Sequence, residues 1–333
     1  MASQLVDRFG RHHTYLRISV TDRCNLRCLY CMPREHIIWK RREELLTFEE
    51  VERVATVAVR LGIRKIRLTG GEPFVRAGIE SLILQLKKIS GLETLAVTTN
   101  ALLLKERLSA VRPFIDAFNI SLDTFREDRF KELTGRDKLR EVLDGIEAVL
   151  EAGYENLKIN AVVMKGINDD ELVDFARFTE KRPVTVRFIE FMPFAGNEWS
   201  NGKLVSMATM MEEIGKEYRL ESISGEISPI SRDFRLVRKS DGRPNRGKIG
   251  VIASMSAPFC ESCSRLRLTA EGKIMPCLHS PLEFDLREVL RLGGTNDDIA
   301  DIFFQALEAK PEEHPSADEL MAQAGRGMIQ IGG

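Results

Sequence analysis

Three cysteines near the amino terminus, Cys24, Cys28 and Cys31, follow the strand-like run 15–20 with the spacing C-x3-C-x2-C. Three thiolates in so short a loop can converge on one metal centre, and four-iron clusters are held by cysteine thiolates in such loops. Three cysteines leave one iron of a [4Fe–4S] cube open to a small molecule. An open coordination position is typical of a catalytic metal site rather than a structural one. A zinc knuckle or a set of buried thiols is the alternative that this spacing leaves open.

The other three cysteines, Cys260, Cys263 and Cys277, form a second triplet with the spacing C-x2-C-x13-C. Disulfides are rare in cytoplasmic proteins, where clustered cysteines usually bind metal. Read alone, this triplet suggests a zinc ribbon that lacks one ligand, which His279 could supply. Alternatively, two triplets with no spare cysteine indicate two three-ligand centres, the second being a cluster whose open iron faces the mouth of a barrel.

The length of 333 residues suits one large α/β domain with an appendage, or two domains, and a hydrophobic share of 43% can bury a large core. The chain has 49 Lys and Arg residues and 50 Asp and Glu residues, so it carries no large net charge that would attract nucleic acid or a membrane surface. An anion site must therefore be built locally. No run is long enough to span a bilayer, and residues 1–4 lead into polar sequence without a signal-peptide core, which predicts a cytoplasmic protein.

Short β-rich runs alternate with helical stretches from residue 15 to about residue 190. The six predicted strands are 15–20, 65–69, 93–98, 117–121, 157–163 and 184–190. Helix boundaries are marked by Thr47 with Glu50, which fit a capping box, and by Gly62 and Gly153 as helix ends. Six β/α units in series imply a parallel sheet with right-handed crossovers, but periodicity does not separate an open sheet from a barrel.

The remainder of the chain reads as shorter elements. The segments are a linker and helix at 191–225, β-like pieces at 234–237 and 249–252, and helical stretches at 285–292 and 299–307. We therefore expect the β/α units to form a domain over residues 1–225, followed by a C-terminal region over residues 226–333 that carries the second cysteine triplet.

The second predicted strand runs into Thr69-Gly70-Gly71-Glu72-Pro73. Two glycines at the carboxyl end of a strand let a ligand approach the backbone closely, although a Gly-Gly turn alone usually marks only a bend. The active face of a parallel barrel lies at the carboxyl ends of its strands. The cysteine loop and this turn are therefore expected on the same face.

Four cations interrupt the predicted strands: Arg17, Arg67, Lys158 and Arg187. A strand buried on both faces should be almost continuously apolar, and an unpaired buried cation is costly. The four side chains could converge on the barrel lumen and hold a polyanion, with arginine suited to bidentate phosphate contacts. The alternative is that they point outward or pair with acids such as Glu190. Further polar residues extend the set: Lys65 on the side of Arg67, Thr98 with Thr99 and Asn100, and Arg265 with Arg267 directly after Cys263.

The C-x3-C-x2-C motif just after a first strand resembles the radical S-adenosylmethionine (SAM) superfamily. The resemblance favours a partial, six-unit TIM-like β/α barrel, and it implies that SAM binds the open iron of a [4Fe–4S] cluster. It assigns Gly71 to the amino group of SAM, and Tyr30 (through its backbone), Ser121 and Met192 to the same ligand. Read without the resemblance, the last three would more often be ordinary loop and core residues.

Further motifs resemble the GTP 3′,8-cyclase family, also called the molybdenum cofactor biosynthesis protein A family, along essentially the whole chain. They are Arg17 before the cysteine loop, residues 66–73 and 98–100, Lys158 before Ile159-Asn160, residues 187–190, the block 260–267 with Cys277, and the terminal Gly332-Gly333. The second cysteine block and the diglycine end are more specific than the first motif. Ala101 departs from the glycine that the family usually has after Thr-Thr-Asn, which puts a backbone turn in question but not the chemistry.

This resemblance implies a lyase that converts GTP to (8S)-3′,8-cyclo-7,8-dihydroguanosine 5′-triphosphate, the first step of molybdenum cofactor biosynthesis. A 5′-deoxyadenosyl radical made from SAM would take the 3′ hydrogen of GTP, and the ribose carbon would then attack C8 of guanine. The chemistry would run at the cluster, without an acid or base side chain. The resemblance also implies an electron donor and a product passed to cyclic pyranopterin monophosphate synthase, and the sequence is compatible with a homodimer.

The residue roles that the family resemblance implies fall into three groups. Two [4Fe–4S] clusters, each with three cysteine ligands, would use Cys24, Cys28 and Cys31, and Cys260, Cys263 and Cys277. GTP would contact Arg17, Arg67, Thr98, Lys158, Arg187, Arg265 and Arg267, with the second cluster at the guanine edge. The tail residues Gly332 and Gly333 would reach the active site, whereas a frayed terminus is the commoner fate of a chain end.

Two other functions remain as alternatives. One is a twin-cluster radical SAM enzyme that modifies peptides, although such families usually carry more cysteines in the C-terminal region than the three found here. The other is a zinc-stabilised binding module, which would explain neither the cations within the strands nor the Gly-Gly turn.

Overall fold

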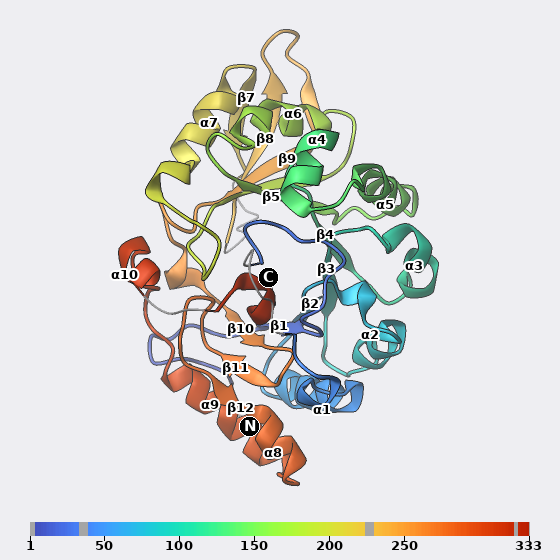
Figure 1. The fold of residues 1–333 in the computed structure, drawn as a ribbon, viewed down its shortest axis with the longest axis vertical. Coiled ribbons are helices and arrows are strands. Elements are labelled where there is room, and N and C mark those ends of the chain that lie inside the picture. Colours follow the sequence, from blue (N-terminus) through green and yellow to red (C-terminus); the bar gives the residue numbers. More distant parts are fainter. Residues whose placement is uncertain (1–3, 33–38, 224–229, 323–325, 333) are drawn as a thin grey trace.

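The computed structural model describes residues 4–32, 39–223, 230–322 and 326–332 (Figure 1). The six predicted strands are all present, with bounds shifted by at most one residue. They are β1 (Tyr15–Ser19), β2 (Lys65–Thr69), β3 (Thr94–Thr99), β4 (Ala117–Ser121), β5 (Lys158–Val163) and β6 (Thr185–Glu190). Each strand pairs in parallel with the next one along the chain. This confirms the predicted α/β fold with a parallel sheet.

The helices that connect these strands lie on the outside of the curved sheet (Figure 1). They are α1 (Phe48–Arg60), α2 (Ile79–Lys87), α3 (Leu104–Val111), α4 (Glu127–Thr134), α5 (Leu139–Glu151) and α6 (Leu172–Phe178). The capping box at the start of α1 is confirmed, because the amide of Glu50 donates to Thr47 Oγ1 and the amide of Thr47 donates to Glu50 Oε2. Gly62 and Gly153 follow α1 and α5 with positive φ, as their predicted role as helix ends requires.

The alternation along the strands separates two faces of the sheet. In β1, Leu16 and Ile18 are fully buried against the core that the outer helices cover. Arg17 between them faces the opposite side, because successive side chains of a strand alternate. The same alternation in the other strands sends apolar side chains outward to the helices and polar ones inward to the lumen.

The later part of the chain adds strands to both edges of this sheet. Its elements are α7 (Met207–Gly215), β7 (Tyr218–Ser222), β8 (Arg232–Arg238), β9 (Pro244–Ile252), β10 (Arg265–Leu268), β11 (Lys273–Met275), β12 (Phe284–Asp285), α8 (Leu286–Arg291), α9 (Asn296–Glu308), α10 (Ala317–Ala322) and α11 (Met328–Ile331). β9 pairs in parallel with β6, and β10 pairs in parallel with β1. The strand order is β12-β11-β10-β1-β2-β3-β4-β5-β6-β9-β8-β7, so within the described residues the barrel stays open between β12 and β7.

The sequence does not predict the strands β7, β10, β11 and β12 or the helices α10 and α11. The segment 191–225 contains the strand β7 in addition to a helix, and the tail forms the short helix α11. β7 pairs with the predicted strand β8, and its Tyr218 is almost fully buried. Among the described residues, no helix has the length and apolar character that crossing a membrane requires.

Candidate active site

The first cysteine triplet lies in the loop that follows β1, at the carboxyl end of the barrel strands. The loop is fixed to the end of α4, because the amides of Arg27 and Leu29 donate to the carbonyls of Thr134 and Leu133 at 2.8 and 3.0 Å. Cys24 Sγ accepts hydrogen bonds from the amide of Leu26 at 3.4 Å and from Asn100 Nδ2 at 3.7 Å.

The chemistry of this donor set fits a metal cluster. Burial, opposed by weaker hydrogen bonds and by the charge of Arg27, raises the pKa of Cys24 to about 11. Burial and the neighbouring Cys24 and Asp123 raise the pKa of Cys31 to about 12, so the free thiols stay protonated at neutral pH. A bound metal would be needed to hold them as thiolates. Within the described ranges, no group of three or more His, Cys, Asp or Glu side chains is already arranged to hold a metal ion.

The Gly-Gly turn after β2 packs directly against the base of the cysteine loop. The amide of Gly71 donates to the carbonyl of Thr21 at 2.7 Å, and the amide of Glu72 donates to that of Arg23 at 2.8 Å. A Cβ atom on Gly71 would lie 2.1 Å from the carbonyl oxygen of Arg23, and one on Gly70 would lie 2.6 Å from that of Thr21. Both glycines are therefore required by backbone contact, a reason that the sequence analysis did not foresee.

Glu72 joins three parts of the site. Its carboxylate accepts hydrogen bonds from Thr99 Oγ1 at 2.8 Å, from the amide of Asn100 at 2.7 Å and from the amide of Phe74 at 3.1 Å. Burial raises the pKa of Glu72 to about 7, although these hydrogen bonds stabilise the ionised carboxylate and act in the opposite direction. Because Asn100 in turn contacts Cys24, Glu72 connects the ends of β2 and β3 to the cysteine loop.

The cations predicted for the lumen come together across neighbouring strands. In register, Arg17 of β1 lies between Arg67 of β2 and Arg267 of β10. Arg67 and Arg267 are both 4% exposed and Arg187 is 7% exposed, so these side chains do not point outward to solvent. The acid named as an alternative partner, Glu190, accepts hydrogen bonds from the amides of Met207, Met255 and Ser256. We call Arg17, Lys65, Arg67, Lys158, Arg187, Arg265 and Arg267 the cation belt.

The positive charges of the cation belt repel one another, and Asp233 opposes this repulsion at Lys158 and Arg187. Burial, followed by the charges of Arg187, Lys65 and Arg67, lowers the pKa of Lys158 to about 8. Burial opposes ionisation of Tyr15, but the charges of Arg67, Arg17 and Lys65 outweigh it and lower the pKa of Tyr15 to about 7. The Tyr15 hydroxyl accepts a hydrogen bond from Arg67 Nε at 2.6 Å. A polyanion in the lumen would relieve the repulsion that these shifts report.

The second cysteine triplet lies beside the amino ends of β10 and β1, whereas the first triplet follows the carboxyl end of β1. Cys260 and Cys263 flank a short turn before β10, and Cys277 follows β11. Burial raises the pKa of Cys260, whereas for Cys263 the charges of Lys310 and Arg265 outweigh burial and lower the pKa. Arg265 lies two residues after Cys263, and Arg267 pairs in register with Met275, two residues before Cys277, so this triplet lies beside the cation belt.

Two cations near this triplet escaped the sequence analysis. Lys310 follows α9, is 2% exposed, and donates from Nζ to the carbonyls of Pro276 and Arg265, the latter at 3.2 Å. Arg11 donates from Nη1 to the carbonyl of Cys260 at 2.9 Å and from Nη2 to that of Pro311 at 2.8 Å. Neither residue lies in a motif, so no local signal marked them.

His279, the predicted fourth zinc ligand, lies in a stack of rings. Its ring centroid is 5.3 Å from that of Phe194 and 5.1 Å from that of His314. Burial, followed by the charges of His314, Arg267 and Arg265, lowers the pKa of His279 to about 3. The side chain is therefore neutral and packed at neutral pH.

The last described residues of the chain, α11 and Gly332, lie within the barrel (Figure 1). The amide of Ile329 donates to the carbonyl of Cys31 at 3.3 Å, and Thr69 Oγ1 donates to the carbonyl of Gly332 at 2.8 Å. Gly332 has a φ of +77°, and a Cβ atom there would lie 2.6 Å from Cβ of Ser19. Gly333, the other predicted tail residue, lies outside the described residues.

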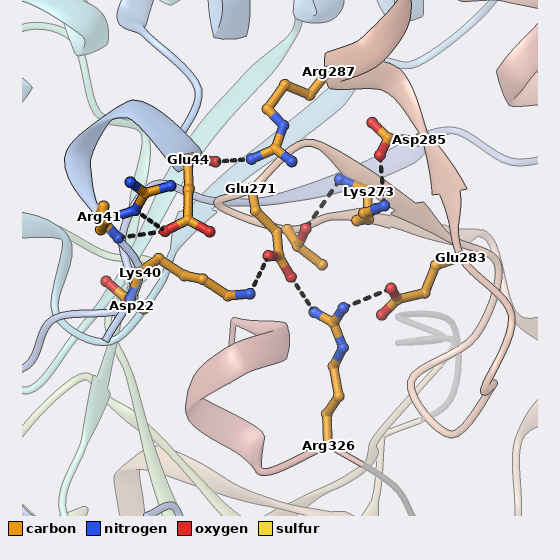
Figure 2. A network of polar contacts seen from close by, with 11 residues as sticks. Asp22, Lys40, Arg41, Glu44, Glu271, Lys273, Glu283, Asp285, Arg287 and Arg326 are labelled. Carbon is orange, nitrogen blue, oxygen red and sulfur yellow. Dashed lines mark hydrogen bonds and ion pairs between the residues drawn. The ribbon is translucent and has the colours of Figure 1, made fainter. Parts of the chain in front are cut away.

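A network of ion pairs fixes the start of this tail. Figure 2 shows Arg326 reaching from the segment before α11 toward Glu271, in the turn between β10 and β11, and Glu283. Arg326 Nη2 lies 2.6 Å from Glu283 Oε2, and Lys40 Nζ lies 2.7 Å from Glu271 Oε2. The amide of Lys40 donates to Asp22 beside the cysteine loop at 2.7 Å. We call Arg326, Glu271, Glu283 and Lys40 the tail latch.

Tyr30, Ser121 and Met192, which are predicted to bind SAM, lie at or beyond the carboxyl ends of β1, β4 and β6. The Tyr30 hydroxyl donates to Asp123 Oδ2 at 2.8 Å, so its side chain is already engaged. Ser121 ends β4 opposite Asn160 of β5, and the carbonyl of Met192 accepts from Asn197 Nδ2 at 2.8 Å. Their contacts with SAM stay predictions.

The turn after β3 keeps a glycine-like conformation despite its alanine. Ala101 has a φ of +64°, in the left-handed region, and is fully buried. Its amide donates to Thr99 Oγ1 at 3.0 Å. The Ala101 backbone therefore adopts the turn at a steric cost of about 1 kcal/mol.

Family models and relatives identify the chain. The model for the Radical SAM superfamily matches residues 18–179, and that for Molybdenum Cofactor Synthesis C matches residues 184–316. Among solved structures, Streptococcus suis SuiB bound to S-adenosylmethionine superimposes with a TM-score of 0.62 over 92% of this chain and 76% of SuiB. At 15% identity this likeness concerns the fold alone.

Curated relatives align along the whole chain. GTP 3′,8-cyclase of Heliobacterium modesticaldum is 44% identical over 99% of this chain and 100% of its own length. The mitochondrial GTP 3′,8-cyclase of Arabidopsis thaliana is 42% identical over 100% of this chain and 84% of its own length. Human molybdenum cofactor biosynthesis protein 1 is 41% identical over 98% of this chain, which covers 51% of that protein. The chain therefore belongs to the radical SAM superfamily and, within it, to the GTP 3′,8-cyclase family.

Proposed function

We propose that this protein is a GTP 3′,8-cyclase, a lyase that converts GTP to (8S)-3′,8-cyclo-7,8-dihydroguanosine 5′-triphosphate in the first step of molybdenum cofactor biosynthesis. The observation that carries the proposal is the cation belt, which lies within a barrel flanked by two cysteine triplets, in a chain that aligns end to end with curated cyclases. A triphosphate is the polyanion that this lumen would neutralise.

As a radical SAM enzyme, the protein uses SAM with a [4Fe–4S] cluster. Cys24, Cys28 and Cys31 are the proposed ligands of this cluster. On one-electron reduction, the cluster with SAM supplies a 5′-deoxyadenosyl radical. The protein's own role is to fix the cysteine loop. The amides of Gly71 and Glu72 bond to the backbone of residues 21–23, and the carboxylate of Glu72 accepts from the amide of Asn100.

A second [4Fe–4S] cluster, held by Cys260, Cys263 and Cys277, is proposed for the guanine end of the substrate. Lys310 and Arg265 favour the thiolate form of Cys263, which is the form that binds iron. Three cysteines would leave one iron for the base.

The cation belt is proposed to orient the substrate. Arg17, Arg67 and Arg267 stand side by side on neighbouring strands, so three planar guanidinium groups can share the phosphate oxygens. Lys158 and Thr98 lie farther along the lumen, toward the proposed SAM residues, where the ribose would follow the phosphates. Such fixed positive groups hold GTP at the radical source without solvent reorganisation.

The tail is proposed to close the lumen over the substrates. Gly332 lies between Ser19 and Thr69 at the carboxyl ends of β1 and β2, where a side chain would not fit. Covering this end of the barrel excludes water, which would otherwise compete for contacts with the reactants.

A product assay tests the proposal. The cluster-loaded protein is incubated under argon with GTP, SAM and a strong reductant, and nucleotides are analysed by mass spectrometry. We expect a product isomeric with GTP together with 5′-deoxyadenosine and methionine. SAM cleavage with GTP left unchanged would refute the cyclase function.

Variants in the lumen sharpen this assay. Arg67→Ala and Arg267→Ala should lower GTP conversion at least about tenfold while uncoupled SAM cleavage continues, because the loss of a charge-assisted hydrogen bond costs ~1.5–3 kcal/mol. Lys216→Ala, on the surface with a side chain 63% exposed, is the matched control. Equal conversion by the Arg67, Arg267 and Lys216 variants would contradict the assignment of the cation belt to GTP.

A further inference from the structure

Asn119 of β4 is a buried amide whose side-chain contacts the free protein does not explain. The residue is 7% exposed, and its Oδ1 is fully buried with no hydrogen-bond partner in the described part of the chain. Leaving a buried acceptor unsatisfied costs about 1–3 kcal/mol. Strain, an ordered water or a ligand can each account for such a group, so the surroundings of Asn119 bear on the choice among them.

The alternation along β4 directs Asn119 into the lumen. Its neighbour Phe118 points to the outside of the barrel, where its ring meets that of Tyr154 edge to face at a centroid distance of 5.0 Å. Successive side chains of a strand alternate, so Asn119 lies on the inner face. Its register partners are Thr98 of β3 on one side and Lys158 of β5 on the other. Both partners are among the residues proposed to contact GTP.

The level of Asn119 in the barrel lies between the two proposed substrates. Arg67 pairs with Ala96, which lies two residues before Thr98, so Arg67 and its register neighbours Arg17 and Arg267 stand one layer nearer the amino ends of the strands. Arg187 pairs with Asn160, the register partner of Ser121, and stands one layer nearer the carboxyl ends. Ser121, proposed to contact SAM, stands one layer nearer the carboxyl ends. Asn119 therefore faces the space where GTP and SAM would meet, which is where the ribose of GTP must lie for its hydrogen to be taken.

The chemistry of this position favours a hydroxyl donor. The side-chain oxygen of an amide can only accept hydrogen bonds, and a phosphate has no proton to offer it at neutral pH. A ribose hydroxyl can donate to Oδ1 of Asn119 and accept from its neighbours. Thr98 Oγ1, the register partner of Asn119, is also buried without a partner among the described residues.

We propose that Asn119 accepts a hydrogen bond from a ribose hydroxyl of GTP and thereby selects ribonucleotides over a deoxy analogue. The inference rests on the proposed function and adds a positioning and specificity residue to it. A site whose buried polar group is left unpaired by an analogue rejects that analogue.

Binding measurements without SAM test the inference, since no turnover then takes place. Cluster-loaded wild-type protein and the Asn119→Leu variant are compared by anaerobic equilibrium dialysis with GTP, 2′-deoxyGTP and 3′-deoxyGTP. We expect the wild type to bind GTP about tenfold more tightly than one of the two deoxy analogues. The Asn119→Leu variant should bind GTP and that same analogue with about equal affinity. The Asn119→Asp variant, which retains an acceptor, should keep the wild-type discrimination even if its overall affinity falls.

The thermal stability of the free protein provides a second readout. Because Oδ1 of Asn119 has no partner to lose, Asn119→Leu should not lower Tm. Asn245→Leu is the matched control, since Asn245 Nδ2 donates to the carbonyl of Ala176 and to Thr179 Oγ1, and this variant should melt several degrees lower. It should bind all three nucleotides like the wild type while folded.

The outcomes separate the inference from the function on which it rests. A wild type that binds none of the three nucleotides would refute the proposed function. A wild type that binds GTP, with an Asn119→Leu variant that keeps the discrimination or loses affinity for all three nucleotides equally, would overturn the role of Asn119 alone. A drop in Tm for Asn119→Leu as large as that for Asn245→Leu would also overturn it, because the amide would then be structural.

Discussion

Thr69 at the end of β2 donates a hydrogen bond of 2.8 Å to the carbonyl of Gly332, 263 positions later in the chain. The contact places the tail at the carboxyl end of the barrel, beside the cysteine loop. Gly332 can make this contact because it tolerates a φ of +77° and has no Cβ atom, which would lie 2.6 Å from Cβ of Ser19. A tail that ends in such a site must be held in place from farther back.

The tail latch is predicted to hold it. Glu271 has a side chain only 7% exposed, and it contacts both Arg326 and Lys40. We expect Arg326→Gln to loosen residues 328–332, which carboxypeptidase should then trim at least about tenfold faster, since about 1.4 kcal/mol of lost anchoring is a factor of ten. Arg41→Gln is the control, because Arg41 lies in the same region with a side chain 72% exposed. Equal digestion of both variants would show that the ion pairs do not anchor the tail.

The sequence revealed the strands and the cation belt because both leave a local pattern. Arg17 and Arg67 each interrupt an apolar run with period two, and strand parity then fixes the face on which they lie. The tail latch leaves no such pattern. Arg326, Glu271 and Lys40 are ordinary charged residues in loops, and their meeting depends on how far-apart segments pack.

The limits of local patterns also explain the other omissions. The strand β7 is short and follows a helix closely, and only its pairing with β8 reveals it. Lys310 reads as the polar end of α9 until the fold buries it beside Pro276 and Arg265. The Gly-Gly turn was noticed, but its close contact with the backbone of residues 21–23 depends on a neighbouring loop.

Gly71→Ala should disrupt the first cysteine site. The new Cβ atom would lie 2.1 Å from the carbonyl oxygen of Arg23, so the backbone of the cysteine loop must move. We expect the iron content after anaerobic reconstitution to fall from about eight to about four per chain. Gly202→Ala is the control, since the nearest atom to its Cβ would be 3.8 Å away. Full iron content in the Gly71 variant would contradict the account of the turn.

Lys310 should raise the reduction potential of a cluster at the second triplet. Its charge acts on both Cys263 and Cys277, and a buried positive charge favours the reduced, more negative cluster. In a Cys24→Ser background, Lys310→Met should lower the midpoint potential by about 50–100 mV, whereas Lys310→Arg should stay near the parent value. Redox titration followed by electron paramagnetic resonance measures the potential. An unchanged midpoint potential in the Lys310→Met variant would show that the charge of Lys310 does not act on the cluster.

GTP affinity should fall as the pH rises through the range in which the cation belt loses positive charge. Tyr15, with a pKa of about 7, becomes negative, and Lys158, with a pKa of about 8, becomes neutral. Bound triphosphate favours the protonated form of both groups, so binding takes up protons. Between about pH 6.5 and about pH 8.5 the affinity should drop about tenfold or more.

The variant Tyr15→Phe isolates one of these groups. Without the tyrosine, the fall in GTP affinity should begin only near the pKa of Lys158, at about pH 8. Equilibrium dialysis at fixed ionic strength measures the GTP affinity of both proteins. The ionisation of GTP affects both equally, so it does not contribute to the difference between their pH profiles. Identical pH profiles for the variant and the wild type would contradict the proposed coupling of Tyr15 to the substrate.

The most direct test of the whole account uses GTP that carries deuterium at C3′ of the ribose. The cluster-loaded protein, with SAM and a strong reductant under argon, should form 5′-deoxyadenosine that contains deuterium, in step with the cyclised nucleotide. 5′-Deoxyadenosine free of deuterium, formed while the labelled GTP stays intact, would contradict the claim that this barrel brings SAM and the ribose of GTP together.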